Sequence, residues 1–181
     1  VNHNLRGEES DSDEKFVRDM CKKLCVPCLV YSAPVAEYAL EHRLSTEEAG
    51  RKLRYDFFEH CAKELGENAK IATAHTLSDC AETFIFNAVR GTGLAGLCGI
   101  PKKRENIIRP IIEFTRSELE DYCRQKEIFF VTDSTNLTDE YTRNKIRHKV
   151  VPVMREINPA FERSLLRLES SLGEARDYFA S

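Results

Sequence analysis

Apolar side chains recur along this chain in two patterns, and together they predict alternating helices and strands. In the longer stretches they return at three- and four-residue intervals, which is the period of one buried helical face. Between these stretches lie short, mostly apolar runs of the kind that form buried strands. The predicted helices span residues 10–24, 45–65, 78–88, 115–126 and 141–148, with two more ending at residue 181, and the predicted strands span residues 1–5, 27–33, 71–74, 106–112 and 128–131.

Polar residues mark the starts of several predicted helices. Ser45–Glu48 and Thr115–Glu118 have the spacing of a capping box, in which the two end residues bind each other's backbone N–H groups. Ser10 and Ser78 are expected to cap two further helices, because a serine hydroxyl accepts a hydrogen bond from the first helical turn.

The order of the elements predicts the fold class. Strands that alternate with helices are typical of a parallel sheet with helices on both faces. We therefore predict the α/β class, with a Rossmann-like, doubly wound parallel sheet in one domain over residues 1–150. Residues 151–181 are predicted to form a helical extension of that domain.

Composition narrows the function classes. The chain has 181 residues, of which 41% are hydrophobic and 31% charged, as in soluble globular proteins. It contains no apolar run near the ~18 residues that a membrane helix needs, so we expect no membrane partner. The net charge of −3 gives no overall attraction to nucleic acid, so any such contact requires a local basic patch.

Seven cysteines are present, and they form no zinc-ligand pattern. A structural zinc site needs two closely spaced cysteine pairs or a pair with histidines at ligand spacing. Only Cys25 and Cys28 form a C-x-x-C pair. We interpret the cysteines as structural thiols in a reducing cytoplasm.

The chain's candidate chemistry centres on residues 70–101. His75 follows the predicted strand at 71–74, and Asp79 and Glu82 lie three residues apart in the helix after it. Ligands of open α/β sheets bind beyond the carboxyl ends of the strands, where all three side chains would point. A helix's first turn also favours carboxylates without any function. Four glycines follow, at positions where backbone must bend or approach something closely: Gly91, Gly93, Gly96 and Gly99.

A basic helix with a polar loop before it forms the second candidate region. Arg143 and Arg147 are four residues apart and therefore share one helical face, with Asn144 beside them. This face is either a ligand site or a solvated surface. Asp133 lies in the preceding loop, and Arg109 lies inside an apolar predicted strand, where it needs a partner.

Four stretches of this sequence resemble the tRNA(Ile)-lysidine synthetase family, which belongs to the PP-loop ATP pyrophosphatases. They are VNHNLRGEESDSDEKFV, AHTLSDCAET, RGTGLAGLCGIP and DSTN…YTRNKIRHKVVPVMREINP. The second resembles the motif H-x-x-D-D-Q-x-E-T, with Ser78 in place of the first Asp and Cys80 in place of the Gln. The family's S-G-G-x-D-S phosphate loop occurs nowhere in these residues, so we expect an incomplete catalytic domain that is inactive alone.

The resemblance implies an adenine nucleotide alpha hydrolase-like fold and a two-step reaction. ATP adenylates the wobble cytidine of an isoleucine tRNA, and free lysine then displaces AMP to give lysidine. It implies Mg²⁺ at Asp79, Glu82 orienting the lysine amine or taking its proton, and Arg147 as a third catalytic residue. Residues implied to bind substrate or ATP are His75, Arg109, Asp133, Arg143 and Asn144.

Other readings stay open beside this one. A tRNA thiolase of the same group would carry sulfur on cysteines, for which Cys25 and Cys28 are the candidates. A non-catalytic nucleotide- or tRNA-binding module is a third possibility. For the family reading we also expect a cytoplasmic protein and consider a homodimer.

Overall fold

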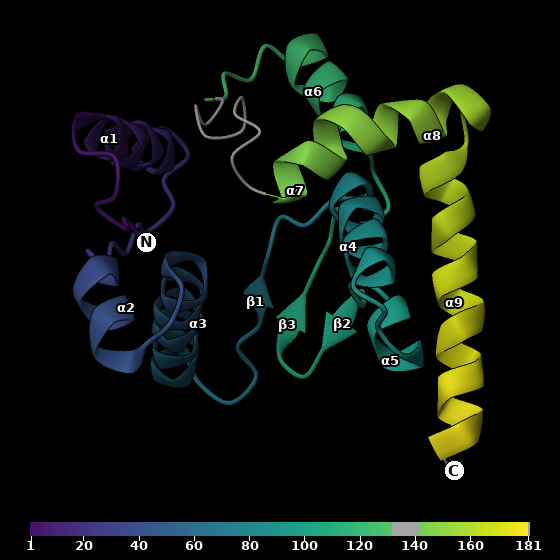
Figure 1. The fold of residues 1–181 in the computed structure, drawn as a ribbon. Helices are drawn as coiled ribbons and strands as arrows, with labels where there is room; N and C mark the ends of the chain where they lie inside the picture. Colours follow the sequence, from purple (N-terminus) through teal and green to yellow (C-terminus); the bar gives the residue numbers. More distant parts are fainter. Residues whose placement is uncertain (132–141, 181) are drawn as a thin grey trace. The chain divides into compact units, whose positions relative to one another are not determined.

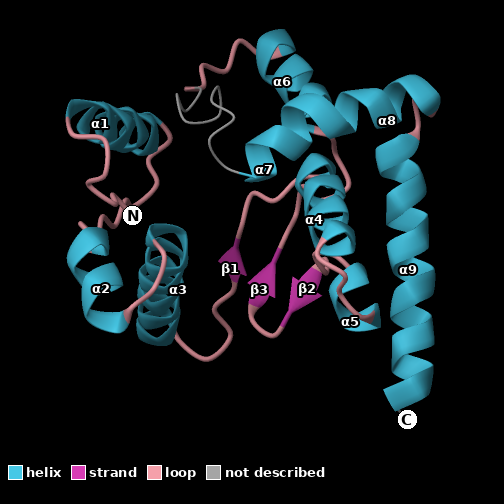
Figure 2. Ribbon diagram, in the orientation of Figure 1, coloured by secondary structure: helices cyan, strands magenta, loops and turns pink. Residues whose placement is uncertain are grey.

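The computed structural model describes residues 1–131 and 142–180, and they divide into two compact units. The first unit covers Val1–Ile71 and the second Ala72–Ser181. Figure 1 traces the elements in chain order, and Figure 2 shows that helices predominate over strands. Among the described residues, no helix combines the length and hydropathy that crossing a bilayer requires.

The first unit contains three helices: α1 (Glu8–Lys23), α2 (Val35–His42) and α3 (Thr46–Leu65). The capping box predicted at Ser45 and Glu48 is confirmed, and α3 begins directly after it. The helix α2, which the sequence reasoning missed, packs on α3. Their contact encloses a small core of Ala33, Val35, Ala39, Ala49 and Leu53.

Two sequence predictions in this unit are wrong in detail. Ser10 does not cap α1, which begins at Glu8; Ser10 is buried in its first turn, where its hydroxyl accepts from the Arg6 N–H. The predicted strands at 1–5 and 27–33 are reduced, in the described structure, to one parallel bridge between Asn2 and Ser32. Two lone neighbouring strands have little to stabilise them, because a sheet of fewer than three strands is marginal.

The second unit holds a small sheet of three short strands in the order β1-β3-β2. The unit boundary falls within β1 (Ile71–Ala72), where a strand was predicted, and Thr73 beyond it donates its N–H to the Ile108 carbonyl at 3.0 Å. The strands β2 (Lys103–Arg104) and β3 (Ile107–Ile108) pair antiparallel. The α/β class is therefore confirmed, but the described strands do not establish the predicted wound parallel sheet.

Helices make up the rest of this unit: α4 (Leu77–Val89), α5 (Leu94–Leu97), α6 (Arg116–Gln125), α7 (Thr142–Lys145), the π-helical turn η2 (Ile146–Val150), α8 (Val151–Ile157) and α9 (Phe161–Ala180). The long α9 runs beside α4 and α5 (Figure 1). Buried clusters join α4 to its neighbours: Leu77 and Cys80 pack on Ile112, and Ile85 packs on Ile146 and Val151.

The predicted strand at residues 128–131 is wrong. These residues form no regular element, and Phe129 is 82% exposed. An apolar run becomes a strand only beside a partner strand, and none of the described strands pairs with it. The capping box at Thr115 and Glu118 is confirmed as the start of α6.

Candidate functional site

Glu82 on α4 and Arg147 on η2 form a two-pronged ion pair. Arg147 donates Nε to Glu82 Oε1 at 2.6 Å and Nη2 to Oε2 at 2.9 Å. The Glu82 side chain is 5% exposed and that of Arg147 20%. The hydrogen bonds that Arg147 donates to Glu82, together with the negative charges of Glu82 and Asp79, raise the pKa of Arg147 above its ordinary value. The pair thus joins two motifs that lie 65 residues apart in the sequence.

Asp79 organises the start of α4. Its Oδ2 accepts hydrogen bonds from the Thr76 N–H at 2.8 Å and the Thr76 hydroxyl at 2.7 Å. The Thr76 hydroxyl in turn accepts from the Asp79 N–H, which completes a capping box. Asp79 Oδ1 lies 3.7 Å from Nη2 of Arg116. The negative charge of Asp79 also contributes to raising the pKa of Arg147.

Ser78, predicted as the cap of this helix, lies inside it and is buried. Its hydroxyl donates to Glu162 Oε1 at 2.8 Å and accepts from the Arg116 N–H at 3.2 Å. The prediction failed because Thr76, two residues earlier, has the extended backbone that a cap requires. Ser78 instead ties the start of α4 to α6 and α9.

The basic helix packs on α4, a contact that the spacing of its arginines did not predict. The Arg143 guanidinium lies 5.9 Å from the centre of the Phe86 ring, one helical turn beyond Glu82. Arg143 and Arg147 therefore share a face, although Arg143 itself remains exposed. Asn144 between them is 8% exposed.

The other three predicted residues are not brought into this ion-pair cluster by the described contacts. The ring nitrogen Nδ1 of His75 shares a hydrogen bond with the Thr73 hydroxyl at 2.9 Å. Arg109 is buried and donates Nη1 to the Pro101 carbonyl at 2.5 Å, while its Nε has no hydrogen-bond partner among the described residues. Asp133, a predicted substrate- or ATP-binding residue, lies outside the described residues.

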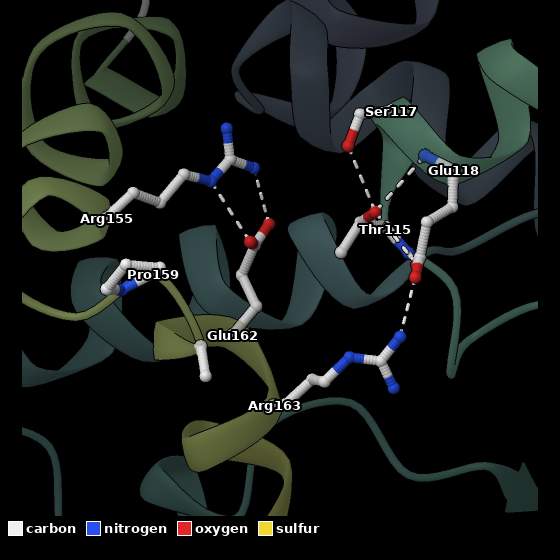
Figure 3. Close-up of a pocket in the computed structure, with 8 residues that line it drawn as sticks. Thr115, Ser117, Glu118, Arg155, Pro159, Glu162 and Arg163 are labelled. Carbon is white, nitrogen blue, oxygen red and sulfur yellow. Dashed lines mark hydrogen bonds and ion pairs between the residues drawn. The ribbon is translucent and has the colours of Figure 1, made fainter.

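Sequence reasoning missed a second set of charged residues beside α4. Glu162 on α9 is 5% exposed. Arg155 on α8 donates Nε to Glu162 Oε2 at 3.0 Å and Nη2 to Glu162 Oε1 at 2.6 Å. Figure 3 shows this pair lining a pocket together with Glu118 and Arg163. The sequence contains an indication of these buried charges. Glu162 and Glu169 are seven residues apart, on either side of buried Leu165, and therefore lie on the apolar face of α9.

Two comparisons with known proteins agree on a family. Residues 1–154 match the PP-loop domain family. The chain belongs to that family. Membership implies the adenine nucleotide alpha hydrolase fold, and proteins of the PP-loop family use ATP.

Several curated relatives of this PP-loop chain share one name. The chain is 46% identical over 174 residues to the tRNA(Ile)-lysidine synthase of Thermosipho africanus, covering 96% of the chain and 40% of the relative. It is 46% identical over 173 residues to that of Bacteroides thetaiotaomicron, with the same two coverages. The Caldanaerobacter subterraneus enzyme of the same name is 44% identical over 179 residues, covering 98% of the chain and 38% of the relative. The chain thus spans about 40% of the length of these relatives.

The carboxylates around the Glu82–Arg147 ion pair are largely occupied by other side chains, which leaves limited room for a metal ion. Glu82 has both carboxylate oxygens bound to Arg147, and Asp79 has Oδ2 engaged by Thr76. Asp79 Oδ1 has only Arg116, at 3.7 Å, near it among the described residues. Magnesium commonly takes one or two carboxylates and completes its shell with phosphate oxygens and water. The residues therefore fit Mg²⁺ as a single-carboxylate site at Asp79, and no group of three or more described ligand side chains offers another.

The names of the relatives do not favour the thiolase alternative, for which Cys25 and Cys28 were the candidate residues. Cys25 is exposed and Cys28 half-buried, and both belong to the first unit. The chain folds back here because Cys25 takes a φ of 54° and Val26 donates its N–H to the Cys21 carbonyl. Cys21, not Cys25, interacts with the Cys28 thiol; burial first and then this contact raise the pKa of Cys21.

Glu169 on α9 is a buried carboxyl group beside the glycine segment. It is 7% exposed, and its Oε1 has no hydrogen-bond partner among the described residues. Gly99 has a φ of 64°, and any Cβ there would overlap the Glu169 carboxylate. Burial raises the pKa of Glu169 from 4.5 to about 7.

This raised pKa predicts a pH-dependent stability. Because the folded chain holds the Glu169 proton more tightly than the unfolded chain, the stabilisation is complete below pH 4.5 and is lost as the pH rises through about 7. We expect the free energy of unfolding to fall by up to about 3 kcal/mol across that range. Urea unfolding of the Glu169→Gln variant should show a flatter pH profile. The exposed Glu174→Gln control on the same helix should keep the original slope, and an unchanged slope in Glu169→Gln would contradict the assignment.

Proposed function

We propose that the whole protein ligates lysine to the wobble cytidine of an isoleucine tRNA. In the first step, ATP adenylates the cytidine and releases diphosphate. In the second, the side-chain amine of free lysine displaces AMP and leaves lysidine. The shared name of the curated relatives supports this activity, whereas it does not favour the thiolase or the non-catalytic module.

The buried Glu82–Arg147 ion pair is the observation that carries the proposal. It brings AHTLSDCAET and YTRNKIRH, which belong to two of the four stretches that carry the family resemblance, into direct contact. A planar guanidinium held at two points has a fixed direction, which suits it to bind a carboxylate or phosphate with matching geometry. We infer that Glu82 fixes Arg147 for contact with the reacting nucleotide.

The remaining residues receive roles from their positions. Asp79 would hold Mg²⁺, which when bound neutralises phosphate charge. Arg143, stacked on Phe86, is placed to bind a phosphate, and Asn144 a base edge or ribose. His75, Arg109 and Asp133 are proposed to bind substrate or ATP.

Glu82 has two candidate roles: to take a proton from the lysine amine, or to position Arg147. Both of its oxygens accept from Arg147, so it could take a proton from lysine only after that pair opens. We therefore favour Glu82 as a positioning residue that acts through Arg147.

The wider architecture also belongs to this proposal. We propose that the whole protein completes a doubly wound parallel sheet within a domain covering residues 1–150, with residues 151–181 leading away from it. We further propose that it works in the cytoplasm, with a homodimer as a possible assembly.

The test is a reconstituted reaction with the full-length protein. ATP, an isoleucine tRNA with a wobble cytidine, and lysine should yield AMP, diphosphate and a tRNA heavier by one free lysine minus one water. A tRNA with uridine at that position is the matched control and should release no AMP. Lysine-independent AMP release, or sulfur incorporation into the tRNA, would overturn the proposal. Residues 1–181 tested alone are expected to be inactive.

A further inference from the structure

Three cysteines lie at the end of α1, and the proposed reaction uses none of them. Cys21 is in the last turn of the helix, Cys25 lies just beyond it, and Cys28 follows three residues later. All three are free thiols; Cys25 is exposed and the other two are half-buried. In the sequence, Cys25 and Cys28 stood out as a C-x-x-C pair. The structure brings a different pair together.

The backbone reverses direction directly after α1. Val26 donates its N–H to the Cys21 carbonyl at 2.9 Å, and Cys25 donates its N–H to the Lys22 carbonyl at 3.2 Å. These two bonds are those of a Schellman motif, which ends a helix with one residue in the left-handed region. Cys25 occupies that position with a φ of 54°. The chain therefore returns over the last turn of the helix.

The residues after this turn place Cys28 beside the helix. Pro27 has a fixed φ and favours extended backbone at Val26 before it. Alternate side chains of an extended segment lie on the same side, so Cys28 shares a side with Val26, which is bonded to Cys21. The Cys28 thiol accordingly makes a hydrogen bond with the Cys21 thiol. Burial first, and then this hydrogen bond, raise the pKa of Cys21.

The two thiols are suited to different steps of a thiol–disulfide exchange. The negative charge of an ionised Cys28 also raises the pKa of Cys21, so Cys21 keeps its proton while Cys28 is a thiolate. A thiolate attacks a disulfide sulfur, whereas a protonated thiol does not. The pair therefore offers one attacking sulfur and, in contact with it, a second thiol that can react afterwards.

We propose that Cys21 and Cys28 form a reversible disulfide by exchange with a small-molecule disulfide. The Cys28 thiolate attacks one sulfur of the oxidant R–S–S–R, whose S–S bond breaks and releases R–S⁻. Cys21 gives its proton to this R–S⁻ and attacks Cys28 Sγ, which releases the second R–S⁻. That thiolate takes up the proton that Cys28 lost at the start. Two protein thiols are thereby oxidised, and one small disulfide is reduced to two thiols.

The bond would tie the end of α1 to the segment that enters the parallel bridge. Asn2 donates its N–H to the Tyr31 carbonyl at 2.8 Å, and Ala33 donates its N–H to the Asn2 carbonyl at 2.7 Å. A disulfide that closes a loop removes conformations from the opened state of that loop. Disulfides in a reducing cytoplasm are usually transient. Oxidation should therefore tighten the bridge around Asn2, and reduction should loosen it again.

The experiment treats the full-length protein with oxidised glutathione and maps its tryptic peptides. Trypsin places Cys21 in residues 19–22, and Cys25 and Cys28 together in residues 24–43. Wild type should give these two peptides joined, with the mass of their sum less two hydrogen atoms, and dithiothreitol should separate them. Amide exchange at Ala33 should slow by about tenfold in the oxidised protein.

Matched variants decide which thiols react, and none of these measurements depends on the proposed ligase activity. Cys21→Ser and Cys28→Ser should lose the cross-link. Cys25→Gly, with glycine at the left-handed position, should keep it, and so should Cys61→Ser, which changes a half-buried thiol on α3. A cross-link that survives Cys28→Ser would come from Cys25 and would overturn the proposal. Glutathione retained on Cys25, or thiols that all stay free, would also overturn it.

Discussion

Asp79→Asn is expected to lower the rate of cytidine adenylation by about 10²- to 10³-fold, the usual cost of losing one group that stabilises transition-state charge. The carboxylate sits at the first turn of α4, and its Oδ1 faces Arg116 at 3.7 Å. Asparagine has nearly the same shape but no charge, so it cannot hold Mg²⁺ in the same way. Diphosphate release in a single turnover with full-length protein, ATP and tRNA measures this step directly.

The fold should survive this change with little loss. The asparagine carbonyl can still accept from the Thr76 N–H, so the capping box is weakened rather than removed, at a cost of about 1 kcal/mol. Asp121→Asn, an exposed carboxylate on α6, is the matched control and should leave the rate unchanged. Near-normal diphosphate release by Asp79→Asn would exclude a role for its charge.

Arg147→Lys and Glu82→Gln are expected to slow the same step of the reaction by at least about tenfold each. Lysine keeps the charge of Arg147 but cannot reproduce the planar fork that binds both Glu82 oxygens. Glutamine keeps the shape of Glu82 but turns one acceptor into a donor facing the guanidinium. Because the two residues act as a unit, the double variant should be little slower than the slower single variant. Single-turnover release of diphosphate and of AMP separates the two steps.

A different outcome would reassign Glu82. If Glu82→Gln slowed only lysine transfer while Arg147→Lys slowed only adenylation, Glu82 would serve the lysine amine independently. Glu82→Gln should also lower the free energy of unfolding by about 2–4 kcal/mol, since it removes the charged partner of a largely buried guanidinium. The Glu120→Gln variant, whose side chain is 41% exposed, controls for the loss of a helical carboxylate and should unfold nearly as wild type does.

Helix starts were predictable where the pattern that specifies them is local. Ser45–Glu48 and Thr115–Glu118 place both halves of a capping box within four residues, and both form as predicted. The capping box at Thr76 and Asp79 was not predicted, because it has aspartate where glutamate is usual. Ser78 was predicted as the cap of this helix instead.

Strands and long-range pairs were harder to predict, since they depend on distant partners. The apolar run at 128–131 has strand composition but no partner strand among those described. Glu82–Arg147 was only implied, by motifs that a family resemblance brought together. The contact of Ser78 with Glu162, 84 residues away, had no local signal at Ser78. The sequence indicated buried polar groups in this region only through Glu162 and Glu169, which lie on the apolar face of α9.

The π-helical turn at Ile146–Val150 fixes how α8 is rotated about its axis relative to the helical turn before it. Val151 donates its N–H to the Ile146 carbonyl five residues back, so this turn holds one residue more than an α-helical turn would. If the same five residues closed as a regular α-helix, all that follows would rotate by about 100°. Either Arg147 would turn away from Glu82, or Val151 would leave its cluster with Ile85. The wide turn therefore lets one continuous stretch of helix place Arg147 on Glu82 and Val151 in the core at the same time.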